Sequence, residues 1–133
     1  MIFGLFGDKR EREAKQLNRD APAIIAQAEA LYSPARLQTM AETIAKYIER
    51  AHKRYGTDPI NLRRAHYDFR NLHKEARRNN DQVGLSAMTL VIIYIRAEIT
   101  GPKADPARAA INAFTATWLH VGGAKHEVPD GDG

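Results

Sequence analysis

Residues 82–100 read QVGLSAMTLVIIYIRAEIT, and this stretch decides the fold. Wound as a helix, it carries apolar side chains around most of its circumference and leaves only a narrow polar stripe. A helix that is apolar on nearly every side is buried, so the segment predicts a central helix surrounded by the rest of the chain. The polar stripe consists of Gln82, Ser86, Thr89, Arg96 and Thr100.

A strand is the alternative for part of this segment, because residues 91–95 are rich in β-branched side chains. We favour a helix, since the segment is long and Asp81 can cap its first turn. The rest of the chain also offers no second strand for pairing. A β-ribbon at 91–95 would overturn the architecture predicted below.

Helix start signals recur along the rest of the chain. A capping Ser or Asp precedes a proline at Ser33-Pro34, Asp58-Pro59 and Asp105-Pro106. Apolar residues with helical spacing follow each start, and glycines follow three of the predicted helix ends, at Gly56, Gly101 and Gly122-Gly123. A weaker break stands at Ala21-Pro22. The signals predict further helices at about 8–19, 22–32, 34–55, 59–79 and 106–121.

The predicted fold class is therefore all-α, a single-domain bundle of four to five helices with 82–100 as its central apolar helix. A length of 133 residues fits one domain with one core. We expect an apolar N-terminal segment at 1–7, the helical bundle domain at 8–121, and a flexible polar tail at 122–133.

The composition excludes several kinds of chemistry and guides the expected location. The chain has no cysteine, which rules out disulfides, a thiolate nucleophile and a cysteine-based zinc site. No run of consecutive apolar residues reaches the roughly 20 that span a bilayer. Basic residues follow the apolar N-terminus instead of preceding it, unlike the order in a signal peptide. We therefore expect a cytoplasmic protein.

Positive charge is concentrated in the middle of the chain. Residues 46–78 carry ten basic and four acidic side chains, whereas the whole chain has a net charge of +4. Such a surface attracts acidic proteins or nucleic-acid phosphates, although a solvated face that serves solubility is the simplest interpretation. The candidate partner-binding residues are Arg50, Arg54, Arg63, Arg64, Tyr67, Arg70, Lys74 and Arg77.

A second candidate surface is apolar. Four large side chains crowd the first six residues, and one tryptophan lies near the predicted end of the last helix. We expect these residues to serve self-association or a partner protein, with membrane-surface contact by the N-terminus as a further alternative. They are Ile2, Phe3, Leu5, Phe6 and Trp118.

Catalytic motifs are missing from the sequence. Glu49 and His52 have the spacing of one half of a di-iron motif, but the other ligands of that motif are not present. His66 and His73 are seven residues apart and lie on one side of their predicted helix, where a structural role is the usual interpretation. Glu98 must be paired if it is buried, and we expect it in a last exposed turn. We predict no catalytic residue, metal ligand or cofactor.

The function predicted from these patterns is a non-enzymatic helical protein-interaction module that self-associates. The expected partner is a second copy of the chain or an acidic protein. A nucleic-acid-binding protein that uses the basic stripe of 46–78 is the alternative. A helical-bundle enzyme that binds a metal or another ligand is the third interpretation.

Overall fold

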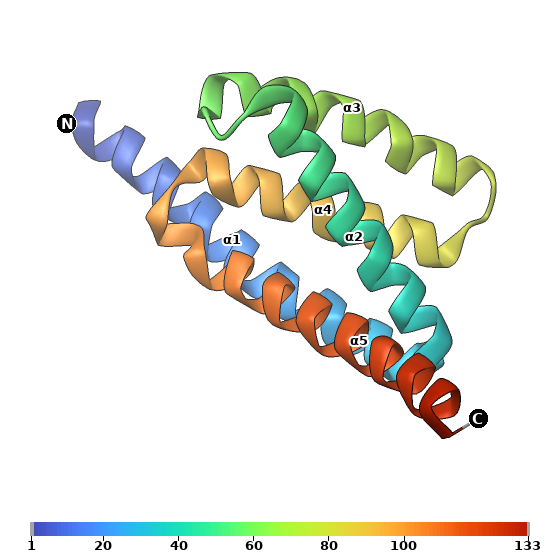
Figure 1. Cartoon of the computed structure of the whole chain (residues 1–133). Coiled ribbons are helices and arrows are strands. Elements are labelled where there is room, and N and C mark those ends of the chain that lie inside the picture. Colours follow the sequence, from blue (N-terminus) through green and yellow to red (C-terminus); the bar gives the residue numbers. More distant parts are fainter. Residues whose placement is uncertain (1, 133) are drawn as a thin grey trace.

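The computed structural model describes the backbone of residues 2–132 and the side chains of residues 9–119, and helices joined by short turns make up that backbone. No strand occurs in that backbone, so the predicted all-α bundle is confirmed and the β-ribbon alternative at 91–95 is wrong. The elements are α1 (Ile2–Leu31), α2 (Pro34–Tyr55), α3 (Pro59–Arg78), α4 (Gln82–Thr100), the short 3-10 helix η1 (Pro102–Ala104) and α5 (Asp105–Asp132) (Figure 1).

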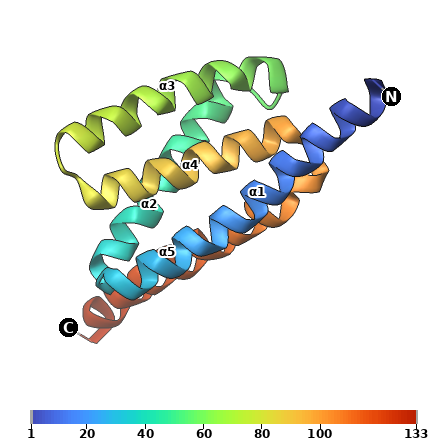
Figure 2. The same cartoon turned by 180° about the vertical axis from the view of Figure 1, so that it is seen from behind.

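The predicted central helix is α4, which packs against α1, α2, α3 and α5. Figure 2 shows it between α3 and α1, with α2 behind. Asp81 caps its first turn by accepting a hydrogen bond from the Gly84 amide at 2.8 Å. Burial of so many apolar side chains is the main favourable contribution to folding. The buried residues of α4 are Ala87, Met88, Leu90, Val91, Ile93, Tyr94, Ile95 and Ala97.

By length and composition alone, α4 could also cross a membrane. The core helix of a soluble protein passes the same test, because both are long and apolar. In this chain the other helices bury 44% of the apolar window. The property therefore does not separate a membrane span from a core helix.

The predicted break at Ala21-Pro22 is wrong, because α1 is one helix that contains Pro22. Proline removes one helical hydrogen bond and usually ends or kinks a helix. Here Pro22 is exposed, and the buried stripe of α1 continues on both sides of it. Packing of that stripe against the bundle overrides the local preference of the proline. The buried residues of the stripe are Ala14, Leu17, Ala21 and Ala28.

Two of the three predicted caps are confirmed. Ser33 accepts a hydrogen bond from the Arg36 amide at 3.3 Å, and Asp58 accepts one from the Ile60 amide at 2.9 Å. The predicted cap at Asp105 is wrong, because η1 leads directly into α5 and leaves Asp105 with helical dihedral angles.

Asn18 of α1 takes over the missing cap. Its side-chain oxygen accepts a hydrogen bond from the Ala107 amide at 2.9 Å, and its amide nitrogen donates to the Lys103 carbonyl at 2.9 Å. A residue 89 positions earlier in the chain thus satisfies the start of α5.

The last helix is longer than expected. α5 continues to Asp132, past the glycines at 122–123 where the sequence predicts its end. The side chains of 120–133 lie outside the described residues, so the flexibility of the predicted tail stays a prediction.

The buried position of Ile95 leads to a stability prediction. Ile95 is fully removed from solvent, so Ile95→Ala should lower the free energy of unfolding by about 2–5 kcal/mol in urea denaturation. Leu31 is 69% exposed and serves as the control, because Leu31→Ala should change it by less than about 0.5 kcal/mol. Equal losses in the two variants would contradict the central position of α4.

Candidate functional site

A groove of about 720 Å³ lies between α1 and α3. Its floor is formed by α4, which lies between those two helices in Figure 2. We call it the basic groove. Its lining consists of Asp20 and Ile24 of α1, His66, Arg70, His73, Lys74 and Arg77 of α3, and Thr89, Ile92, Ile93 and Arg96 of α4.

The wall of α3 is a ladder of alternating imidazole and guanidinium groups. Positions 66, 70, 73 and 77 are four, three and four residues apart, so helical periodicity places them on one side of α3. That side adjoins the buried stripe of Leu62, Ala65 and Phe69, which holds α3 against the bundle. The fold therefore aims the ladder into the groove.

The two histidines of the ladder favour the neutral form. Partial burial lowers the pKa of His66, and the positive charges of Arg96 and Arg70 lower it further, against a small opposite effect of Glu13. Burial also lowers the pKa of His73, and Arg77 adds to the shift. Both imidazoles are thus largely uncharged near pH 7 and can accept a proton when a negative group approaches.

The charge of the groove is one-sided. Asp20 is the carboxylate among its lining residues, and it accepts a hydrogen bond from Gln16 at 2.8 Å. Arg96 is bound to Glu13, with Nη2 2.7 Å and Nε 3.2 Å from Oε1. Within the described part of the chain, the cations of the α3 wall make no ion pair. These cations are Arg70, Lys74 and Arg77.

The predicted basic surface is divided by the fold. Arg70, Lys74 and Arg77 line the groove, whereas Arg63, Arg64 and Tyr67 are exposed outside its lining. Two further residues lie on the α2 side, where the Arg50 and Arg54 guanidinium groups stack over the rings of Tyr47 and Tyr55.

The acidic residues of α3 do not neutralise the groove. Asp68 accepts a hydrogen bond from the Tyr55 hydroxyl at 2.6 Å, which ties α3 to α2 and raises the pKa of Tyr55. Neither Asp68 nor Glu75 belongs to the groove lining. The acidic residues that lie between the basic ones in the sequence of α3 are therefore absent from the lining of the basic groove.

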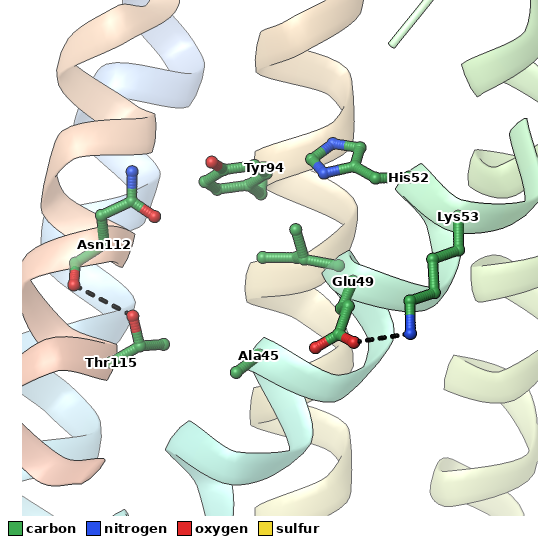
Figure 3. A pocket seen from close by; sticks show the side chains of 8 residues that line it. Ala45, Glu49, His52, Lys53, Tyr94, Asn112 and Thr115 are labelled. Atoms are coloured by element: carbon green, nitrogen blue, oxygen red, sulfur yellow. Dashed lines mark hydrogen bonds and ion pairs between the residues drawn. The ribbon is translucent and has the colours of Figure 1, made fainter. Parts of the chain in front are cut away.

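A second pocket of about 490 Å³ lies between α2 and α5, with Tyr94 of α4 at its base (Figure 3). His52 Nε2 lies 2.7 Å from Glu98 Oε1, and Glu49 pairs instead with Lys53 at 3.1 Å. Glu49 and His52 thus turn to different partners. Among the side chains of residues 9–119, no three His, Asp or Glu residues are placed to hold a metal ion.

The expectation of an exposed Glu98 is wrong. Its side chain is only 9% exposed, because α2 covers the last turns of α4 and supplies His52 as the partner. The Arg108 guanidinium also lies 5.3 Å from the centre of the Tyr94 ring. The Thr115 hydroxyl donates to backbone carbonyls of its own helix. The His52–Glu98 pair joins α2 to α4. The Thr115 hydroxyl, which also lines this pocket, is hydrogen-bonded to the backbone.

Of the residues predicted to form an apolar surface near the chain ends, the structure describes only the side chain of Trp118. Ile2, Phe3, Leu5 and Phe6 lie outside the residues whose side chains are described. Trp118 is half-buried against the core, and its indole nitrogen donates to Glu29 Oε2 at 3.0 Å. Self-association through these residues stays a prediction.

Sequence reasoning missed the groove residues of α1 and α4. Arg96 belongs to the predicted polar stripe of 82–100, but nothing local indicates that it faces the ladder of α3. Asp20 and Ile24 carried no signal, because the sequence predicted a break between them. Comparisons of the sequence with family models and curated proteins, and of the structure with solved structures, found no match.

The His52–Glu98 pair leads to a second stability prediction. His52→Ala leaves a nearly buried carboxylate without its partner and should lower the free energy of unfolding by about 1–3 kcal/mol. Glu98→Gln keeps a hydrogen bond to the imidazole and should cost clearly less. Urea denaturation of both variants at pH 7 checks this difference, and a larger loss for Glu98→Gln would contradict the assigned pairing.

The lowered histidine pKa values predict acid sensitivity. Below the usual histidine value of 6.5, the unfolded chain binds protons that the folded groove resists. The free energy of unfolding should therefore fall as the pH is lowered from 7.5 to 5. The variant with His66→Gln and His73→Gln should have a flatter pH profile in urea denaturation. A profile as steep as that of the natural chain would refute the burial of these imidazoles.

Proposed function

We propose that this chain is a non-enzymatic protein-interaction module whose basic groove binds an acidic amphipathic helix of a partner protein. One observation carries the proposal. The same groove combines cations that have no ion-pair partner in the described structure with an apolar floor. Acidic side chains satisfy the first feature and apolar side chains the second, and an amphipathic acidic helix presents both.

The floor favours a protein partner over a nucleic acid. Ile92 on the floor and Ile24 on the α1 wall are only partly buried, and Ile93 of the floor also lines the groove. A phosphate backbone gains affinity from neutralised charge and obtains nothing from such a floor. Apolar side chains of a protein segment would remove this surface from water, which contributes about 25 cal/mol per Å² of buried apolar area.

The shape of the groove favours a helix. Its two walls are helices and its floor is a third, which is the arrangement of helix-in-groove recognition. The ladder from His66 to Arg77 spans eleven residue steps, or about 16 Å. Three turns of a partner helix cover this length, so carboxylates three or four residues apart would meet successive rungs.

The basic ladder leads to a binding prediction. A fluorescein-labelled helical peptide of about 14 residues, with a Glu stripe beside a Leu stripe, should bind with an affinity that falls as salt rises. Fluorescence anisotropy should show at least about tenfold weaker binding for the variant with Arg70→Glu and Arg77→Glu. Arg63→Glu is the matched control on the same helix, and it should change the affinity by less than about twofold.

Two results of this experiment would count against the proposal. A scrambled peptide of the same composition that binds equally well would mean that the apolar floor is not used. A single-stranded oligonucleotide of equal charge that binds more tightly than the peptide, and is weakened by the same variant, would favour the nucleic-acid alternative.

A further inference from the structure

Three nitrogen-bearing side chains from two helices line the basic groove near one another, close enough for two of them to act electrostatically on the third. His66 and Arg70 come from successive turns of α3, and Arg96 comes from the facing part of α4. The charges of both arginines act on the His66 imidazole, which is partly buried. No other part of the groove lining has cations from two helices around one imidazole.

The negative groups around this cluster are both on α1. Glu13 binds Arg96 at 2.7 Å through Nη2 and at 3.2 Å through Nε, and Asp20 is held by Gln16. The Nη1 group of Arg96 makes no hydrogen bond to Glu13, and Arg70 has no ion-pair partner in the described structure. Glu13 and Asp20 offset two of the four cations that line the groove, so the groove as a whole keeps a positive charge. The cluster also keeps free N–H donors while Glu13 is bound.

The number of these donors, and their origin on two helices, indicate what kind of anion fits. A carboxylate has two oxygens, and a single arginine fork can satisfy both. Donors from two guanidinium groups and one imidazole, arriving from two helices, suit a group with three oxygens and up to two negative charges. A phosphate ester on a side chain has both properties.

We propose that His66, Arg70 and Arg96 form a phosphoryl-binding subsite within the basic groove, and that the partner helix carries a phosphorylated side chain there. This inference rests on the proposed function and names the chemistry of its partner. Binding needs no covalent step. The phosphoryl oxygens accept hydrogen bonds from the two guanidinium groups and from the imidazole, which takes up a proton as the dianion approaches.

A pair of peptides tests the subsite. The first is the acidic amphipathic peptide described above, and the second has phosphoserine in place of one central Glu. Fluorescence anisotropy with the natural chain should show about tenfold tighter binding of the phosphoserine peptide, because charge-assisted hydrogen bonds to the extra oxygens are strong. Equal affinities for the two peptides would overturn the subsite.

Two variants separate the role of Arg96 from its role in holding α1. Arg96→Gln removes a phosphoryl ligand and also the bond to Glu13, whereas Glu13→Gln removes only that bond. The preference for phosphoserine should disappear in Arg96→Gln and persist or increase in Glu13→Gln. A preference that survives Arg96→Gln, or that is lost in both variants, would contradict the assignment.

The His66 imidazole gives a second readout. In NMR titrations of the natural chain, the phosphoserine peptide should raise the pKa of His66, and the Glu peptide should raise it less. An unchanged pKa of His66 on saturation with the phosphoserine peptide would refute the contact. Inorganic phosphate should displace the phosphoserine peptide only weakly. Displacement at equal concentration would point to free phosphate as the ligand and overturn the inference about the partner.

This design keeps the two proposals separable. If both peptides bind equally and the variant with Arg70→Glu and Arg77→Glu weakens both, the acidic-helix function stands and the phosphoryl subsite is wrong. If neither peptide binds, the proposed function and the subsite are both wrong.

Discussion

Removal of water from α4 is the constraint on which the rest of this structure depends. An apolar side chain on nearly every face of one helix can be buried only if other helices surround it, so α1, α2, α3 and α5 all pack against α4. Side-chain pairs hold these neighbours in place, among them the His52–Glu98 pair to α2 and the Arg96–Glu13 pair to α1. Asn18 of α1 likewise holds the start of α5, because its side-chain oxygen accepts a hydrogen bond from the Ala107 amide.

The coverage of α4 is incomplete on one side, and that side is where the function is proposed. α1 and α3 flank the helix there without closing over Ile92 and Thr89, so part of the apolar floor stays in reach of solvent. The His and Arg ladder of α3 borders this floor because it adjoins the buried stripe of the same helix. A groove with an apolar base and a cationic α3 wall follows from the packing, and a partner helix would complete the shell around α4.

Local patterns predicted what local chemistry determines. The all-round apolar character of 82–100 identified the central helix, and Ser33 and Asp58 marked two helix starts. The errors concern residues whose state depends on distant partners. Pro22 stays inside α1 because packing on both sides holds the helix, and Glu98 is covered because α2 supplies His52. Only the α3 part of the groove could be predicted from the sequence, because its cations share one helix. Arg96 comes next to them only when the chain folds.

Solvent accessibility of single isoleucine methyl groups tests this account most directly. A soluble gadolinium chelate should broaden the methyl NMR signals of Ile92 on the groove floor but not those of Ile95, which is fully buried. Saturation with the acidic amphipathic peptide should then protect Ile92. The account is contradicted if Ile92 stays equally exposed with the peptide bound, or if Ile95 broadens as strongly as Ile92 in the free protein.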